Sequence, residues 1–200
     1  MLEEALGILD ETPNLASSIE INGQIALAHL RLGQEEKALA YAEKVLQLSE
    51  KISPTVYSMD VGFSGAADVY FELWERSLRD SGTNSDHLKA LAERAFKLLI
   101  AFEKVFPIGK AVTPIYQGWY EWLMGKPEAA IKTLRRGLEA ALKFNMIYEE
   151  GLIRLKLAVY SQGNLDVRNR NLWRAMEIFE RMGALNELRL AQEEAQKAGV

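Results

Sequence analysis

Apolar residues recur along this chain with the three- and four-residue spacing of amphipathic helices. No run of β-branched residues alternates with polar ones, as a half-buried strand would require. The five prolines fall near the ends of the periodic segments, where a helix tolerates them. The pattern predicts an all-α fold of about ten helices: residues 2–10, 17–32, 34–50, 57–79, 86–105, 114–125, 127–144, 148–161, 168–182 and 185–198.

Capping signals mark several of the predicted helix ends. Ser17 with Glu20 three residues later is the pattern of a capping box. Thr113 followed by Pro114 suits an N-cap and a first helical position. Gly183 is expected to stop the helix over 168–182.

Two segments share one spacing of small residues, which predicts helices folded back on each other. The shared positions are Ala26, Gly33 and Ala38 in the first segment and Gly118, Gly125 and Ala130 in the second. The first small residue lets the partner helix come close, the glycine opens the turn, and the alanine lies at the contact. Apolar or small residues continue the register at equal offsets: Ala42, Val45, Leu134 and Gly137.

The corresponding triplet of a later second helix is Ala175, Phe179 and Met182, 45 residues after the triplet that begins at Ala130. This spacing predicts about four helical hairpins of roughly 46 residues each, with a long turn around Gly163–Asn171. Gly62 and Gly65 receive no role from the sequence.

The small-residue positions resemble the tetratricopeptide repeat, which has small residues at its eighth and twentieth positions and glycine at its fifteenth. The match is good in the two segments above, partial around Ala175 and poor around Ala67 and Tyr70. The resemblance implies a right-handed superhelix of antiparallel helical hairpins that binds other proteins.

Residues 137–158 and 173–192 are similar to the C-terminal helical repeats of large bacterial signalling proteins. In those proteins the repeats follow a nucleotide-switch ATPase module, and the chain carries a nucleotide cyclase, a kinase or a DNA-binding effector domain. This resemblance covers about residues 110–198. It implies that residues 1–200 form a single helical-repeat domain, a fragment of a longer signalling chain.

The charge and residue composition of the chain disfavour some classes of binding partner. A net charge of −4 and a pI near 5.4 disfavour nucleic acid and anionic membranes. The chain has no cysteine, no apolar run of about 20 residues and no signal peptide at its start, so we expect a soluble, cytoplasmic protein.

The chain lacks the residue combinations that common metal and nucleotide sites of enzymes need. The two histidines, His29 and His87, lie on separate predicted helices, which disfavours a zinc site. Lys110 and Lys126 each follow a glycine but lack the hydroxyl residue and the preceding glycine of a phosphate-binding loop. We therefore predict no enzyme activity, no metal and no cofactor.

Clustered charges favour a solvated surface. We expect three carboxylate pairs at polar faces or helix ends: Glu35–Glu36, Glu149–Glu150 and Glu193–Glu194. One predicted hairpin contains four arginines and a lysine: Arg154, Lys156, Arg168, Arg170 and Arg174. We expect them to form a solvated face, and a binding site for an acidic partner or a phosphate is the less favoured alternative.

The segment Ile115–Leu123 is apolar on nearly every side. Central burial explains this pattern, and a binding groove is the alternative. In the repeat register, the residues expected to line a concave face are Leu27, Leu30, Arg31, Trp119, Trp122 and Leu123. The Lys/Asn carboxylate clamp of chaperone-binding repeats does not match, because those positions hold Gly23, Leu27, Ile115 and Trp119.

These observations favour a non-catalytic interaction or regulatory scaffold of a bacterial signalling protein, which binds a peptide or a partner domain on its concave face. The alternative is a small-molecule effector-sensing domain of a transcriptional activator. It would need an enclosed apolar cavity in place of an open groove. The oligomeric state is not predicted.

Overall fold

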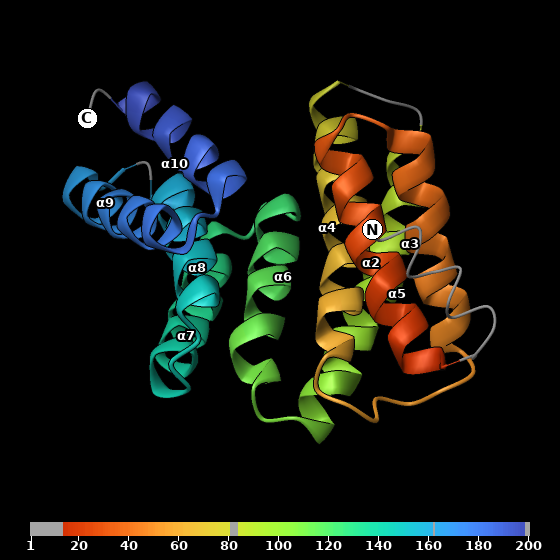
Figure 1. Ribbon diagram of the computed structural model, residues 1–200. Helices are drawn as coiled ribbons and strands as arrows, with labels where there is room; N and C mark the ends of the chain where they lie inside the picture. The colour runs from red at the N-terminus through yellow and green to blue at the C-terminus, as the bar shows by residue number, and fades with distance from the viewer. Residues whose placement is uncertain (1–13, 81–83, 162, 199–200) are drawn as a thin grey trace. The chain divides into compact units, whose positions relative to one another are not determined.

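The computed structural model describes residues 14–80, 84–161 and 163–198, and every regular element in these residues is an α-helix (Figure 1). The helices are α2 (Leu15–Arg31), α3 (Glu35–Ser49), α4 (Met59–Arg79), α5 (Ser85–Val105), α6 (Gly109–Leu123), α7 (Pro127–Lys143), α8 (Ile147–Tyr160), α9 (Leu165–Met182) and α10 (Leu185–Ala198). The predicted all-α fold class is confirmed. The helix predicted over 2–10 lies outside the described residues.

The chain divides into two compact units, residues 1–109 (unit 1) and residues 110–200 (unit 2), which are described separately. In unit 1, α2 packs against α3 and α4, and α4 packs against α5. Each helix buries one apolar face, which stabilises the fold by about 25 cal/mol for each Å² of apolar surface removed from water. Phe63 of α4 meets Phe102 of α5 edge-on, with ring centroids 6.4 Å apart.

Helices α2 and α4 cross in backbone contact through three glycines. A β-carbon added to Gly65 would lie 2.2 Å from the carbonyl oxygen of Gly23, and one added to Gly23 would lie 2.2 Å from that of Gly62. No side chain fits at such a distance, so these three positions require glycine. Gly62 and Gly65, to which the sequence assigned no role, therefore form the surface of α4 on which α2 rests.

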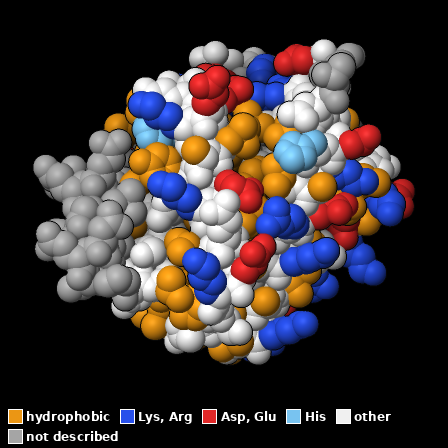
Figure 2. Space-filling view, turned by 90° about the vertical axis from the view of Figure 1, so that its right-hand side faces the viewer, with side chains coloured by type: hydrophobic (Ala, Val, Ile, Leu, Met, Phe, Trp, Pro, Cys, Tyr) orange, Lys and Arg blue, Asp and Glu red, His pale blue; other side chains and the backbone are white. Residues whose placement is uncertain are grey.

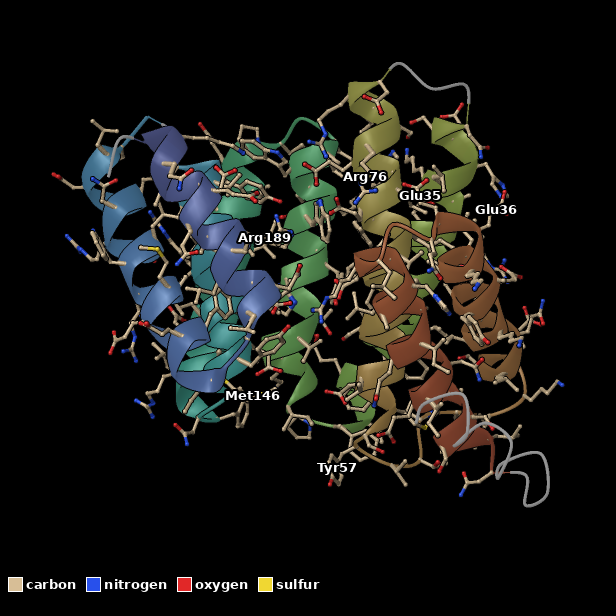
Figure 3. All side chains as sticks on the ribbon, turned by 45° about the horizontal axis from the view of Figure 1, so that its top comes forward. Glu35, Glu36, Tyr57, Arg76, Met146 and Arg189 are labelled. Carbon is tan, nitrogen blue, oxygen red and sulfur yellow. The ribbon has the colours of Figure 1, made fainter. Side chains whose placement is uncertain are left out.

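An ion pair also joins the two hairpins of unit 1. Arg76 of α4 and Glu35 of α3 point toward each other (Figure 3), and Arg76 Nη1 lies 2.8 Å from Glu35 Oε1. Arg76 Nε also pairs with Glu72 at 3.0 Å, one turn earlier on α4. Because these side chains are largely exposed, the pairs contribute little to stability.

Four helix ends share one turn geometry. The two predicted turn glycines, Gly33 and Gly125, both have φ of 71°, and Gly183 has φ of 67°. The N–H of Gly33 donates to the carbonyl three residues earlier at 3.0 Å, and that of Gly125 does so at 2.9 Å. Gly183 ends α9 as predicted. Asn145, with φ of 55°, makes the same turn between α7 and α8.

In unit 2, α6 pairs with α7, α8 pairs with α9, and α10 packs on α9. A β-carbon added to Gly118 would lie 2.7 Å from Leu134 Cγ, so the small residue lets α6 and α7 approach, as predicted. Gly137 likewise makes room for the ring of Pro114, since a β-carbon there would lie 2.7 Å from Pro114 Cβ.

The repeat in unit 2 is 38 residues long, because α7 and α9 begin 38 residues apart and so do α8 and α10. The predicted spacing of 45 residues is wrong. In the 38-residue register Ala175 corresponds to Gly137 and not to Ala130. Accordingly Met182, which was expected at the helix contact, is 50% exposed.

Two predicted helix starts are also wrong. Asn14, and not Ser17, caps α2: its side chain accepts a hydrogen bond from the Ser17 backbone N–H at 3.2 Å. Asn164 caps α9 in the same way, so residues 165–171 are helical and the long turn expected there is absent.

The predicted helix start at Pro114 is also wrong, because Pro114 lies inside α6 and not at its first position. The helix begins at Gly109, so Thr113 is not a cap. Pro114 is the sixth residue of the helix, and it costs only the hydrogen bond to the first-turn carbonyl of Lys110.

Candidate interaction surface

In unit 1, the predicted surface residues lie on the last two turns of α2. Leu30 is buried, Leu27 is half-buried and Arg31 is exposed. Their spacing of three and four residues places them on one face of the helix. Leu32 follows directly and is 70% exposed, so the end of α2 presents apolar surface beside a guanidinium group.

In unit 2, two of the three predicted residues of α6, Trp119 and Trp122, contact α8. Trp119 is 6% exposed, and the ammonium nitrogen of Lys156 lies 3.3 Å from the centroid of its ring. Trp122 is half-buried and stacks on Tyr160, with centroids 4.1 Å apart and planes 5° apart. Leu123 is half-buried. One face of each indole is therefore already covered, so Trp122 and Leu123 offer the accessible apolar area of this set.

The sequence did not single out Tyr160, although a signal for it exists. Tyr160 follows Trp122 by 38 residues, which is the repeat length of unit 2. The two rings thus occupy equivalent positions in consecutive repeats, and they stack because first helices of neighbouring repeats lie side by side. The correct repeat length would have paired them.

Three of the five predicted basic residues form ion pairs within unit 2, contrary to the expectation of a solvated face: Arg154, Arg168 and Arg174. Arg170 is exposed, as expected. Glu150 is 5% exposed. It accepts a hydrogen bond from Arg154 Nε at 2.8 Å and another from Arg174 Nε at 3.2 Å. Arg154 also donates to Asn171 Oδ1 at 3.2 Å, so a buried carboxylate holds α8 to α9.

Two further charged residues of this region, Arg168 and Glu149, are also paired or partly buried. Arg168 donates to the Glu194 backbone carbonyl at 3.3 Å and lies 3.8 Å from the carboxylate of Glu194, which joins α9 to α10. Burial raises the pKa of the Glu149 carboxyl above its ordinary value. The expectation that Glu149 and Glu150 form a solvated pair is therefore wrong.

The surface of the described residues includes the following two hollows. One, of about 500 Å³, is lined by six residues of a single face of α7: Glu128, Ile131, Lys132, Arg135, Arg136 and Glu139. The other, of about 270 Å³, lies in unit 1 at the end of α3. The search for clusters of three or more potential metal ligands, made over the described residues, finds none there.

Comparison with known families gives one match. Residues 19–52 match the family model of the tetratricopeptide repeat. This segment covers most of α2 and all of α3, and it contains Gly23, Ala26, Gly33 and Ala38. Among the described helices, none has the length and apolarity needed to cross a bilayer. Neither the curated proteins nor the solved structures contain a match to the chain. The repeat match and the helical fold together support a tetratricopeptide-like architecture.

Proposed function

We propose that this chain is a non-catalytic interaction module of a cytoplasmic bacterial signalling protein, and that the first helices of its hairpins bind a peptide or a partner domain. The observation that carries the proposal is the tetratricopeptide match over residues 19–52, because repeats of this kind generally mediate protein–protein contacts. The bacterial signalling context rests on the resemblance of residues 137–158 and 173–192.

The contact residues of the proposal lie on α2 and α6. In unit 1 they are Leu27, Leu30 and Arg31, which combine apolar area with a cation at the end of α2. In unit 2 they are Trp119, Trp122 and Leu123. Tryptophan is one of the residue types that contribute most of the binding energy at protein interfaces. Since Trp119 is buried under Lys156, its part is to support the surface, and Trp122 carries the direct contact.

Peptide selection with matched tryptophan variants tests the proposal. Peptides are selected from a random display library against the whole chain, and their dissociation constants are measured. We expect Trp122→Ala to weaken binding at least about tenfold, the loss of one interface anchor. Trp173→Ala is the control, because Trp173 is 61% exposed on the second helix α9. Equal losses for both variants, or a loss for Trp173→Ala alone, contradict the proposal.

The same variants need a fold control, because Trp122 stacks on Tyr160. Thermal melts of both proteins identify any loss of structure, and amide chemical shifts locate the bound peptide. Shifts at α2 or α6 support the first-helix surface, whereas shifts confined to α7 and α9 oppose it. The alternative function, effector sensing, would require an enclosed apolar cavity, and both described hollows lie at the surface.

A further inference from the structure

Unit 1 contains a small hollow whose lining comes mainly from the loop after α3, and none of its lining residues belongs to the surface proposed above. It has a volume of about 270 Å³ and lies where α3 ends, between the following loop, α4 and α5. Its lining residues are Ser49, Glu50, Lys51, Ile52, Ser53, Pro54, Phe63, Leu98 and Ala101. In Figure 2, which views the molecule from the side of α3 and α5, hydrophobic side chains are exposed among basic and acidic side chains.

The floor of the hollow is apolar and firmly held. Phe63 is 1% exposed and is fixed by its contact with Phe102. Leu98 and Ala101 lie one turn apart on α5, and both are half-buried. The volume is below the range of about 300–1,000 Å³ typical of small-molecule sites. It suits a single large apolar side chain delivered by a peptide.

The rim of the hollow is basic. Lys51 lines it directly, and Lys97 and Lys104 flank Ala101 at spacings of four and three residues on α5. All three lysines are exposed, and no ion pair of theirs is found within the described part of the chain. The one carboxylate among the lining residues, Glu50, is already paired with Arg94 at 3.2 Å.

We propose that this hollow binds an acidic peptide segment that inserts one large apolar side chain. The apolar side chain fills the space over Phe63, Leu98 and Ala101, and flanking Asp or Glu residues pair with Lys51, Lys97 and Lys104. The chain as a whole carries a net charge of −4, so the basic rim gives a local attraction for acidic peptides that the net charge does not provide. The interaction weakens with salt, because the lysines are exposed to solvent.

A panel of seven-residue peptides tests the proposal with the full chain. Each peptide has three acidic residues on either side of a central Leu, Ile, Met, Phe or Trp, and a matched peptide has Ala at the centre. Titrations followed by amide chemical shifts should show saturable binding of at least one peptide, with shifts at Ile52, Leu98 and Ala101. The Ala-centred peptide should bind at least tenfold more weakly.

Three substitutions separate the apolar and electrostatic parts. Ala101→Leu fills the hollow without a change of charge and should abolish binding. Lys97→Glu and Lys104→Glu should each weaken binding at least threefold. Lys37→Glu makes the same charge change near the opposite end of α3 and should leave binding unchanged, since Lys37 is exposed and remote from the hollow.

Three results would overturn the proposal: no peptide of the panel shifts the amides of the hollow, the Ala-centred peptide binds equally well, or Lys37→Glu weakens binding as much as Lys97→Glu. Dimerisation of the free chain that Ala101→Leu abolishes would assign the hollow to a second copy and would also overturn it. Because Trp122→Ala leaves this hollow intact, a failure here is distinct from a failure of the first-helix surface.

Discussion

Replacing Gly65 with alanine should destabilise unit 1, although the same change in an open helix is favourable. Alanine is better than glycine in a helix interior by about 1 kcal/mol. At this position the added methyl group would lie 2.2 Å from the Gly23 carbonyl oxygen and 2.6 Å from its carbon. Non-bonded carbon contacts are stable at about 3.5–4.0 Å, so α2 and α4 must separate by at least about 1 Å.

The loss of stability in Gly65→Ala depends on whether the atoms that the new methyl group meets can move. Overpacking typically costs about 1–3 kcal/mol when side chains can adjust. Here the obstacle is the helix backbone of Gly23, which cannot adjust as a side chain can, so we place the cost at or above the upper end of this range, at about 3–4 kcal/mol. After the gain in helix propensity, a net loss of about 2–3 kcal/mol remains. In a chain of this size that lowers the melting temperature by about 5–10 °C.

Thermal and urea unfolding followed by far-UV circular dichroism measures this loss. Gly163→Ala is the matched control, because no atom lies within 4 Å of a β-carbon there. It should change stability by less than about 0.5 kcal/mol. Gly33→Ala has equally open space but φ of 71°, so it should cost about 1 kcal/mol through backbone strain alone. A Gly65→Ala protein as stable as the Gly163→Ala protein would refute the close crossing of α2 and α4.

Three further outcomes are expected from unfolding experiments. Ala38→Leu and Ala130→Leu should each cost about 1–3 kcal/mol, since both alanines are fully buried, and unchanged urea midpoints would contradict the helix contacts. Glu150→Ala should cost about 3 kcal/mol because it removes the buried carboxylate that pairs with Arg154 and leaves Arg174 with Glu177 alone, whereas Glu193→Ala, at an exposed pair, should cost less than about 1 kcal/mol. Burial raises the pKa of the Glu149 carboxyl, so the folded state keeps this carboxyl protonated to a higher pH than the unfolded state does. The free energy of unfolding therefore falls as the pH rises from the unfolded pKa through the folded pKa. Glu149→Gln should be more stable than wild type at pH 7, and an equal or lower melting temperature of the variant at that pH would refute the prediction.

The glycines show which features of the fold can be predicted from the local sequence alone. Gly33 and Gly125 could be assigned to turns, because a left-handed residue after a helix favours glycine whatever lies nearby. Gly23 and Gly65 could not be assigned, since a glycine inside a helix only lowers local propensity until the helix that crosses it is known. Their role belongs to the pairing of α2 with α4, which periodicity within one helix does not encode.

The charges of unit 2 illustrate the same limit. Adjacent glutamates in a helix point about 100° apart, so Glu149 and Glu150 have different surroundings even though they are neighbours in sequence. Glu150 faces α9, where Arg174 meets it at 3.2 Å. Composition predicts that charges stay in water, but a buried carboxylate is accommodated when arginines from two helices satisfy it. Arg154 lies one turn away on the same helix, so the pairing of α8 with α9 is needed only for the second arginine, Arg174.

The repeat of unit 2 is 38 residues and not the 45 predicted from the sequence, for a geometric reason that also bears on its aromatic surface. Positions seven apart in a helix differ by only about 20° in direction, so a register shifted by seven residues preserves the apolar face. The apolar pattern therefore aligns Ala175 with Ala130 as well as with Gly137, and only the start of α9 at Leu165, after its cap Asn164, distinguishes the two registers. In the 38-residue register, Trp122 and Tyr160 become equivalent and stacked first-helix residues. The aromatic surface of unit 2 is thus a property of two successive repeats, and a partner that recognises it must contact α6 and α8 together.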